Sequence, residues 1–250
     1  SRGLGDVYKR QIHTLLMECF KSRKVLAVEL YAGVREDEVI NELKSLSPTL
    51  LINTRDLMKP ENEIKEMTER FMTKDVLFGY VTNLSLKDYF DAGKLEVARK
   101  QVAANDRVIV VGSGAAMIAQ AEATLVYVDM ARWEIQQRFR AHEVKALGVD
   151  NREDAVSLQY KRGYFNDWRV LDKYKEGLFD KADFWLDTHI ANDPRMIDRE
   201  TFFKGIEETI KTPFRVVPFF DPAPWGGQWM KEVCGLNPEK ENYGWCFDCV

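Results

Sequence analysis

The chain alternates short, almost wholly apolar runs with longer amphipathic stretches, and this alternation limits the fold more than any other feature. Runs that are apolar at nearly every position are typical of strands covered on both faces. Stretches with apolar residues three and four positions apart are typical of helices that pack against such strands. Seven runs are predicted to be strands: residues 24–30, 49–53, 76–81, 107–111, 124–129, 184–187 and 215–219.

Five amphipathic stretches are predicted to be helices: residues 35–45, 61–72, 86–104, 131–147 and 199–210. Strands that alternate with helices favour parallel pairing, because each helix carries the chain back to the starting edge of the sheet. The predicted fold class is therefore α/β, with three layers in which helices cover both faces of a mainly parallel sheet.

Composition excludes several functional classes. The formal charge of −4 and the absence of a long Lys/Arg block predict neither a nucleic-acid partner nor a membrane partner. Without a membrane-length apolar run or a signal-peptide pattern, a cytoplasmic location is the expectation. The three His residues are widely separated, and the C-x-x-C pair Cys246/Cys249 has no second half-site. Chance spacing is favoured over half a zinc site or a redox pair, so no metal site is predicted within these residues.

Two predicted strand ends carry small residues that would let a ligand approach the backbone. The first, residues 31–34, has one Gly and lacks the G-K-[ST] element of a phosphate-binding P-loop, so triphosphate chemistry of the usual type is not expected there. The second is Gly112, Ser113 and Gly114, a G-x-G turn before a helix start, where an anion could bind. A tight turn that lets the helix pack closely is the favoured alternative, since the third Gly of the dinucleotide fingerprint is missing.

A basic region follows the predicted strand that ends at Asp129. Guanidinium groups that converge on one point suit phosphate recognition. The alternative is a solvated charged face whose ion pairs contribute little stability, and both interpretations stay open. The phosphate-binding candidates of this region are Arg132, Arg138, Arg140, Lys161 and Arg162.

Four segments carry a family resemblance: W-E-I-Q-Q-R-F-R, Y-K-R-G-Y-F-N-D-W-R, P-F-R-V-V-P-F-F-D-P-A-P-W-G-G-Q-W-M-K-E-V and N-Y-G-W-C-F-D-C-V. Together they resemble long bacterial class I mannose-6-phosphate isomerases over nearly all of residues 12–250. The resemblance implies a zinc-dependent interconversion of mannose 6-phosphate and fructose 6-phosphate on a cupin domain. It also implies that the preceding α/β region is similar in layout to P-loop nucleoside or nucleotide kinases, with the Walker A element absent.

The resemblance places the metal ligands beyond Val250, so this chain alone is expected to lack the zinc site and isomerase activity. The residues that carry over as substrate-cavity candidates are Trp225, Gly226, Gly227, Gln228 and Lys231, with a structural strand start as the alternative. The implied partners are a sugar phosphate, a nucleotide and the protein's own cupin domain. A different class of function stays open, namely a regulatory module of kinase-like fold that binds a nucleotide or sugar phosphate without kinase activity.

Three segments are predicted along the chain. Residues 6–11 read D-V-Y-K-R-Q, the translation of a transposase adapter used in sequencing libraries, so residues 1–11 are predicted to be an adapter artefact. Residues 12–212 are predicted to form the α/β domain. Residues 213–250 are predicted to be the incomplete β start of a cupin domain.

Overall fold

The computed structural model describes residues 4–119, 122–212, 216–219, 231–233, 235, 237 and 246–249. The chain divides into two compact units, Ser1–Arg199 and Glu200–Val250. In the second unit, β7 (Val216–Phe219) pairs antiparallel with β8 (Cys246–Cys249). Helix α9 (Arg199–Thr209) begins at the last residue of the first unit.

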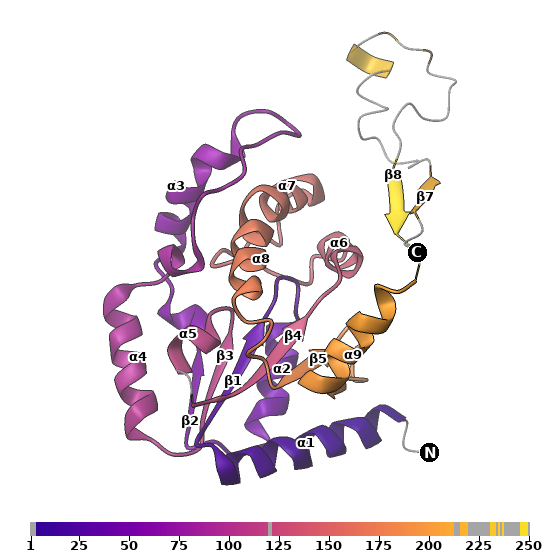
Figure 1. Ribbon diagram of the computed structural model, residues 1–250. Helices are drawn as coiled ribbons and strands as arrows, with labels where there is room; N and C mark the ends of the chain where they lie inside the picture. The colour runs from indigo at the N-terminus through magenta and orange to yellow at the C-terminus, as the bar shows by residue number, and fades with distance from the viewer. Residues whose placement is uncertain are drawn as a thin grey trace. The chain divides into compact units, whose positions relative to one another are not determined.

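A six-stranded sheet forms the centre of the first unit, in the order β2-β3-β1-β4-β5-β6 (Figure 1). The first five strands are parallel and β6 runs antiparallel to β5, so the predicted mainly parallel α/β fold is confirmed. The strands are β1 (Val25–Leu30), β2 (Leu50–Asn53), β3 (Val108–Gly112), β4 (Thr124–Asp129), β5 (Phe184–Asp187) and β6 (Arg195–Asp198).

Helices cover both faces of this sheet. Val28 of β1 and Val126 of β4 face α1 (Leu4–Ser22) and α2 (Glu36–Lys44) across one cavity. Their sequence neighbours Ala27 and Leu125 face α5 (Ala115–Ala119) and α8 (Trp168–Glu176), because successive strand side chains point to opposite faces. The remaining helical elements are η1 (Thr54–Leu57), α3 (Glu61–Met72), η2 (Leu86–Tyr89), α4 (Ala92–Ala104), α6 (Arg132–Arg140), α7 (Val156–Arg162) and the π-helical turn η3 (Gly163–Asp167).

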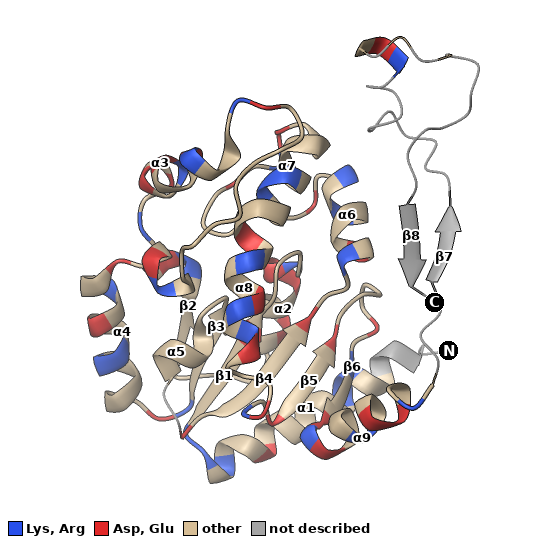
Figure 2. Cartoon of the chain, turned by 45° about the horizontal axis from the view of Figure 1, so that its top comes forward, with Lys and Arg blue, Asp and Glu red and all other residues tan. Residues whose placement is uncertain are grey.

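The apolar runs form the core, as their sequence predicts. The four Val and Ile side chains of β3 are wholly buried, which explains why this strand is apolar at every position. Lys, Arg, Asp and Glu lie mainly on the helices and loops, while most strand residues are uncharged (Figure 2). None of the described helices is both long and apolar enough to cross a lipid bilayer.

One predicted strand is wrong. Residues 76–81 form an exposed loop after α3, in which Phe78 and Tyr80 are each 69% exposed. The Asp75 carboxylate accepts hydrogen bonds from the backbone amides of Leu77 and Phe78, at 2.7 and 2.6 Å. These bonds fold the segment into a turn, because an Asp side chain competes with the strand ladder for neighbouring backbone amides.

Two predicted helices are shorter than expected. Residues 86–104 divide into η2 and α4, and the Asp91 carboxylate caps α4 by accepting from the Lys94 amide at 2.8 Å. Helix α6 ends at Arg140, and His142 then takes a left-handed conformation with φ of 55°. Local apolar spacing continues past both breaks, so periodicity alone did not locate them.

Helix α1 includes residues 6–11, which the sequence predicts to be adapter-derived. Lys9 Nζ lies 2.7 Å from Glu42 Oε1 and 3.1 Å from Asn192 Oδ1. The origin of residues 1–11 stays a prediction.

Candidate functional site

The carboxyl ends of β1, β2 and β3 meet at one edge of the sheet, and a small pocket lies between them. Residues 31–34, 53–55 and 112–113 of the three strand ends line this pocket, together with residues 145–147 and 167–168. Glu36, Met58, Phe139 and Leu171 also line it. Its cavity measures about 20 Å³, which is room for a single water molecule. We call this site the edge pocket.

Two glycines bring the strand ends close together. Gly33 and Gly112 both have left-handed backbone conformations, with φ of 79° and 124°. A Cβ atom on Gly112 would lie 2.1 Å from Thr54 Oγ1, and one on Gly33 would lie 2.7 Å from Ile135 Cγ1. Any larger residue would therefore force the lining apart, so these positions require glycine.

Three buried polar atoms of the lining have no hydrogen-bond partner among the described residues. They are Thr54 Oγ1, Asp167 Oδ1 and Trp168 Nε1. Such atoms are rare in folded proteins, because a buried polar group that has lost water needs another partner. The set contains a donor, an acceptor and a hydroxyl that does both. A water molecule in the cavity or the hydroxyl groups of a ligand would supply such partners.

Asp167 reaches the edge pocket from η3, the π-helical turn between α7 and α8. Turns of this kind are rare and occur frequently at functional sites. The Leu147 amide donates to Asp167 Oδ2 at 3.0 Å, and Arg162 Nε lies 3.5 Å from Oδ1. Burial raises the pKa of Asp167, while Arg162 and the Leu147 amide lower it in part. The carboxyl group is thus held in place by one oxygen while the other lacks a hydrogen bond.

Two cationic side chains line the same pocket. Arg55 donates to both carboxylate oxygens of Glu36, at 2.9 and 2.6 Å, and to the Ala146 carbonyl. Lys145 is held loosely, with Nζ 3.8 Å from Asp150 Oδ2 and its side chain 36% exposed. Arg55 is therefore occupied by the protein, whereas the Lys145 ammonium is available to an anion at the pocket mouth.

The predicted G-x-G anion turn after β3 already holds a carboxylate of the protein. The amides of Gly114 and Ala116 donate to the two oxygens of Glu29, at 2.5 and 2.9 Å, and Ser113 Oγ donates to the Leu30 carbonyl at 2.8 Å. Glu29 is only 1% exposed. Burial raises its pKa to about 8, although the backbone amides of α5 act in the opposite direction. A phosphate would have to displace Glu29 to use these amides.

Arg138, one of the predicted phosphate ligands, is a buried structural residue with an exposed fraction of 1%. Its guanidinium donates to the Gly33 carbonyl at 2.8 Å and to the carbonyls of Thr188 and His189 at 3.0 and 3.1 Å. It also pairs with Glu134 at 2.8 Å. Arg138 therefore ties the end of β1 to the loop after β5.

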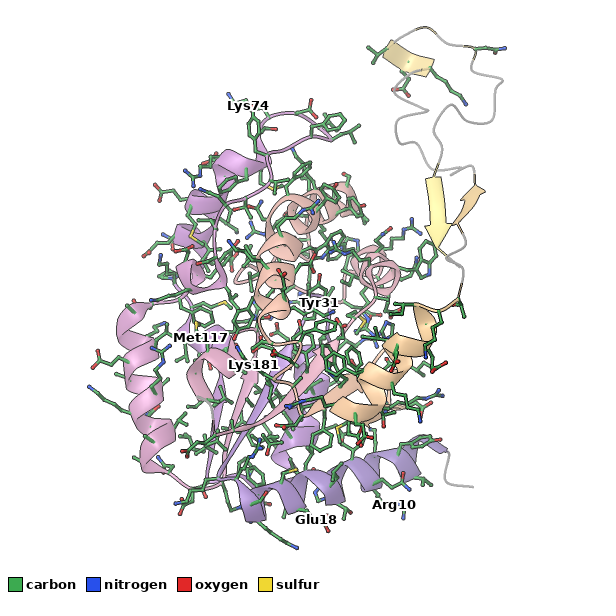
Figure 3. All side chains as sticks on the ribbon, viewed as in Figure 1. Arg10, Glu18, Tyr31, Lys74, Met117 and Lys181 are labelled. Atoms are coloured by element: carbon green, nitrogen blue, oxygen red, sulfur yellow. The ribbon has the colours of Figure 1, made fainter. Side chains whose placement is uncertain are left out.

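Arg132 and Arg140 lie at opposite ends of α6. Arg132 pairs with Asp172 of α8 and stacks 4.4 Å above the ring of Trp168. Tyr31, which directly follows β1 (Figure 3), donates its hydroxyl to the same Asp172. Arg140 is exposed. Arg132 thus holds α8 against the sheet edge.

The two basic residues of α7 are both buried. Lys161 donates to the Asp75 carbonyl, and Arg162 contacts Thr68 Oγ1 at 3.2 Å and Asp167. Within the described structure, none of the five predicted basic residues lines the edge pocket. Arg132, Arg138 and Arg162 each contact a residue that does, so the basic region lies around the pocket and holds its lining in place.

The predicted cavity residues of the C-terminal segment mostly fall outside the described residues, namely Trp225, Gly226, Gly227 and Gln228. Lys231 is described and begins a helical turn at residues 231–233.

Sequence reasoning did not select Thr54, Lys145 or Asp167. A signal existed for Thr54, which directly follows a predicted strand at the ligand-binding edge. The π-helical turn that carries Asp167 begins at Gly163, which lies outside the predicted helices. Lys145 has no comparable local signal.

A zinc ion is implied by the family resemblance, with ligands predicted beyond Val250. Within the described part of the chain, no group of three or more His, Cys, Asp and Glu side chains could hold a metal ion. These residues do not fit a zinc centre, and the zinc site stays a prediction about sequence outside this chain.

Comparison with known proteins identifies a family without assigning an activity. No curated protein and no solved structure matches the chain. Residues 9–211 match a family described as a domain of unknown function, and every residue that lines the edge pocket lies within that range. The chain therefore belongs to the family described as Domain of unknown function (DUF8485).

Proposed function

We propose that the first unit binds a small phosphorylated ligand, a sugar phosphate in preference to a nucleotide, in the edge pocket. The observation that carries this proposal is the set of three buried polar atoms without partners, Thr54 Oγ1, Asp167 Oδ1 and Trp168 Nε1. Their residues line a pocket at the carboxyl ends of parallel strands, where ligands of such sheets bind.

The chemistry of the lining favours a sugar phosphate. Asp167 accepts a hydrogen bond from a sugar hydroxyl, while Thr54 and Trp168 donate to hydroxyl oxygens. Lys145 supplies the charge that pairs with a phosphate group. A nucleobase gains less, because Trp168 is buried against other side chains and offers no open ring face.

Binding requires the pocket to open. Its cavity of about 20 Å³ is far smaller than a sugar phosphate. Residues 145–147 are joined to the sheet edge through the bonds from Arg55 to the Ala146 carbonyl and from the Leu147 amide to Asp167. We infer that the ligand replaces these bonds and displaces this loop.

The proposed layout is like that of P-loop nucleoside or nucleotide kinases, with ligand binding but without phosphoryl transfer. The parallel sheet, the helices on both faces and a pocket at the strand ends support it. The loop after β1, residues 31–34, contains no Lys and no Ser or Thr to take the roles of the P-loop side chains.

Replacing Lys145 by Ala is expected to weaken mannose 6-phosphate binding about tenfold, equivalent to roughly 1.4 kcal/mol, because one phosphate ion pair is lost. Isothermal titration calorimetry with mannose 6-phosphate, ATP and UTP measures this effect. Lys100→Ala is the matched control, because Lys100 forms an exposed pair with Glu96 on α4. Absence of heat with all three ligands, or an equal loss in both variants, contradicts the proposal.

We also propose that the chain is part of a class I mannose-6-phosphate isomerase. The supporting observation is the sequence resemblance, whose most specific part is the W-G-G segment at Trp225, Gly226 and Gly227. The proposed zinc ligands follow Val250. Turnover of mannose 6-phosphate by this 250-residue chain in a coupled assay, with zinc retained, would overturn that placement.

A further inference from the structure

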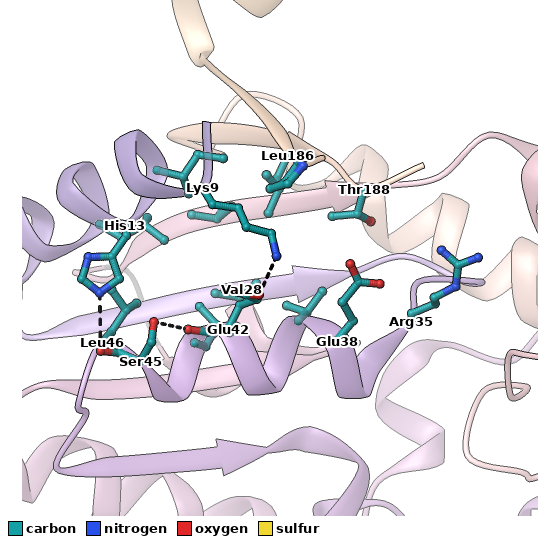
Figure 4. A pocket seen from close by; sticks show the side chains of 16 residues that line it. Lys9, His13, Val28, Arg35, Glu38, Glu42, Ser45, Leu46, Leu186 and Thr188 are labelled. Atoms are coloured by element: carbon teal, nitrogen blue, oxygen red, sulfur yellow. Dashed lines mark hydrogen bonds and ion pairs between the residues drawn. The ribbon is translucent and has the colours of Figure 1, made fainter. Parts of the chain in front are cut away.

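A second cavity, separate from the edge pocket, lies between α1, α2 and one face of the sheet (Figure 4). It measures about 90 Å³. Its lining includes Val28, Val126 and Leu186 of the strands, Leu16 of α1 and Leu43 of α2. These side chains are aliphatic, and Val126 is completely buried. His13, Ser45 and Thr188 add polar groups to the lining, and Thr188 Oγ1 has no hydrogen-bond partner among the described residues.

The cavity is open to solvent and is not an enclosed void of the core. Close-packed interiors seldom leave so much room beside aliphatic side chains. A polar void of this volume would hold ordered water, but an apolar one stays dry and takes up small apolar molecules. The aliphatic floor therefore selects a hydrocarbon group as its occupant.

The mouth of the cavity is polar, and among its described ion pairs none includes the carboxylate of Glu38. Lys9 Nζ lies 2.7 Å from Glu42 Oε1 and connects α1 to α2 (Figure 4). Arg35 pairs with Glu143 at 2.6 Å, and Glu38 is half-buried at the rim. An anionic ligand would meet the carboxylates of Glu38 and Glu42, and a cationic one would lose more hydration than a hydroxyl beside the aliphatic lining. An uncharged hydroxyl can donate to the Glu38 carboxylate, whose Oε1 also accepts from the Asn192 amide at 3.1 Å.

We propose that this cavity binds an uncharged amphiphile with a short, unbranched alkyl chain, its hydroxyl at the Glu38 rim. The chain fits better than an aromatic ring, because an apolar cavity that holds benzene measures roughly 150 Å³. Lys9 contributes only to the mouth, and the lining from Ile12 onward carries the proposal. This site is independent of phosphate binding at the edge pocket.

The test is a titration of the intact chain with n-alkanols from propanol to octanol, followed by amide chemical shifts in two-dimensional NMR. Each added methylene is expected to tighten binding about fourfold, as burial of one CH₂ group does, until the chain fills the cavity. Beyond that length the affinity levels off. Shifts are expected in residues of α1, α2 and β4, and benzyl alcohol is expected to bind more weakly than the best alkanol.

Two variants are expected to fill the cavity and abolish binding, Val126→Phe and Leu43→Phe. If Val126→Phe does not fold, Leu43→Phe still tests the proposal. Far-UV circular dichroism checks that each variant is folded. Val97→Phe, on the exposed face of α4, is the matched control and keeps the affinity of the original chain. The proposal is overturned by shifts that do not saturate, by an affinity without length dependence, or by unchanged binding in a folded Leu43→Phe variant.

Discussion

At the scale of single residues, buried or half-buried ionisable side chains serve mainly to hold the strand ends in place. Glu29 binds the amides at the start of α5, and Arg138 binds three backbone carbonyls from two loops. Lys175 pairs with Asp129 and lies over the rings of Tyr31, Tyr127 and Trp185, at 5.3, 5.5 and 5.7 Å. Each of these side chains replaces lost water with protein partners, as buried polar groups must.

Glu29 is expected to make stability depend on pH. Its pKa of about 8 in the folded chain exceeds that of an exposed Glu, near 4.3. As the pH rises, the unfolded chain therefore releases the Glu29 proton before the folded chain does. The contribution of protonated Glu29 to the free energy of unfolding is complete below about pH 4 and is lost as the pH rises to about 8. Over that range the free energy of unfolding is expected to fall by at most about 1.4 kcal/mol per pH unit.

The comparison that isolates this effect is urea unfolding of the original chain and of Glu29→Gln between pH 5 and 8. The Gln side chain cannot titrate, so its curve is expected to be flatter. Glu96→Gln, at an exposed position on α4, is expected to follow the original chain. Parallel curves for all three proteins would show that Glu29 does not hold a proton in the folded state.

Arg138 and Arg140 offer a matched pair on one helix. Arg138→Met is expected to lower the free energy of unfolding by about 3 kcal/mol or more, because it leaves buried carbonyls without donors. Arg140→Met, at an exposed site, is expected to change it by less than about 0.5 kcal/mol. Chemical unfolding measures both, and equal effects would contradict a structural role for Arg138.

At the scale of elements, neighbouring polar groups decide whether an apolar run becomes a strand. Residues 76–81 have the composition of β3, but Asp75 binds two of their amides and their apolar side chains remain exposed. β3 lies between β1 and β2, and both of its neighbours supply ladder bonds. An apolar hexapeptide thus forms a strand only where a neighbouring strand offers free backbone groups for hydrogen bonding.

Hydrogen exchange is expected to separate these two segments. Amides of β3 are expected to exchange only on global unfolding, because they are buried and paired on both sides. Amides of residues 76–81 are expected to exchange through local opening, orders of magnitude faster. Mass spectrometry of peptides from the labelled chain measures both. Similar protection would mean that residues 76–81 pair as the sequence pattern alone predicts.

At the scale of the whole first unit, the stability of the sheet depends on its central strands. Val110 of β3 is fully buried between two neighbouring strands. Val110→Ala is expected to cost about 2 kcal/mol, from lost apolar burial and the cavity left behind. Val97→Ala, on the exposed face of α4, is expected to cost less than about 0.5 kcal/mol. Urea unfolding measures both, and equal costs would contradict this assignment of the core.

The sequence by itself determined the α/β class, most strands of the sheet and the helix at residues 61–72. These features depend on apolar spacing, capping residues and turn chemistry, which act over a few residues. It located a basic region after the strand that ends at Asp129, with phosphate recognition and a solvated charged face as the two open interpretations. The sequence did not show that the side chains of Arg138 and Glu29 would form hydrogen bonds with the protein's own backbone.

Only the tertiary structure decided which polar groups surround the edge pocket. Thr54, Lys145 and Asp167 are distant in sequence, and the crossovers of the parallel sheet bring them to one edge. Whether a polar atom is left without a partner depends on which segments cover it and exclude water, which no local pattern records. The candidate site is therefore a property of packing, because burial changes the free energy of a polar group far more than its neighbours in sequence do.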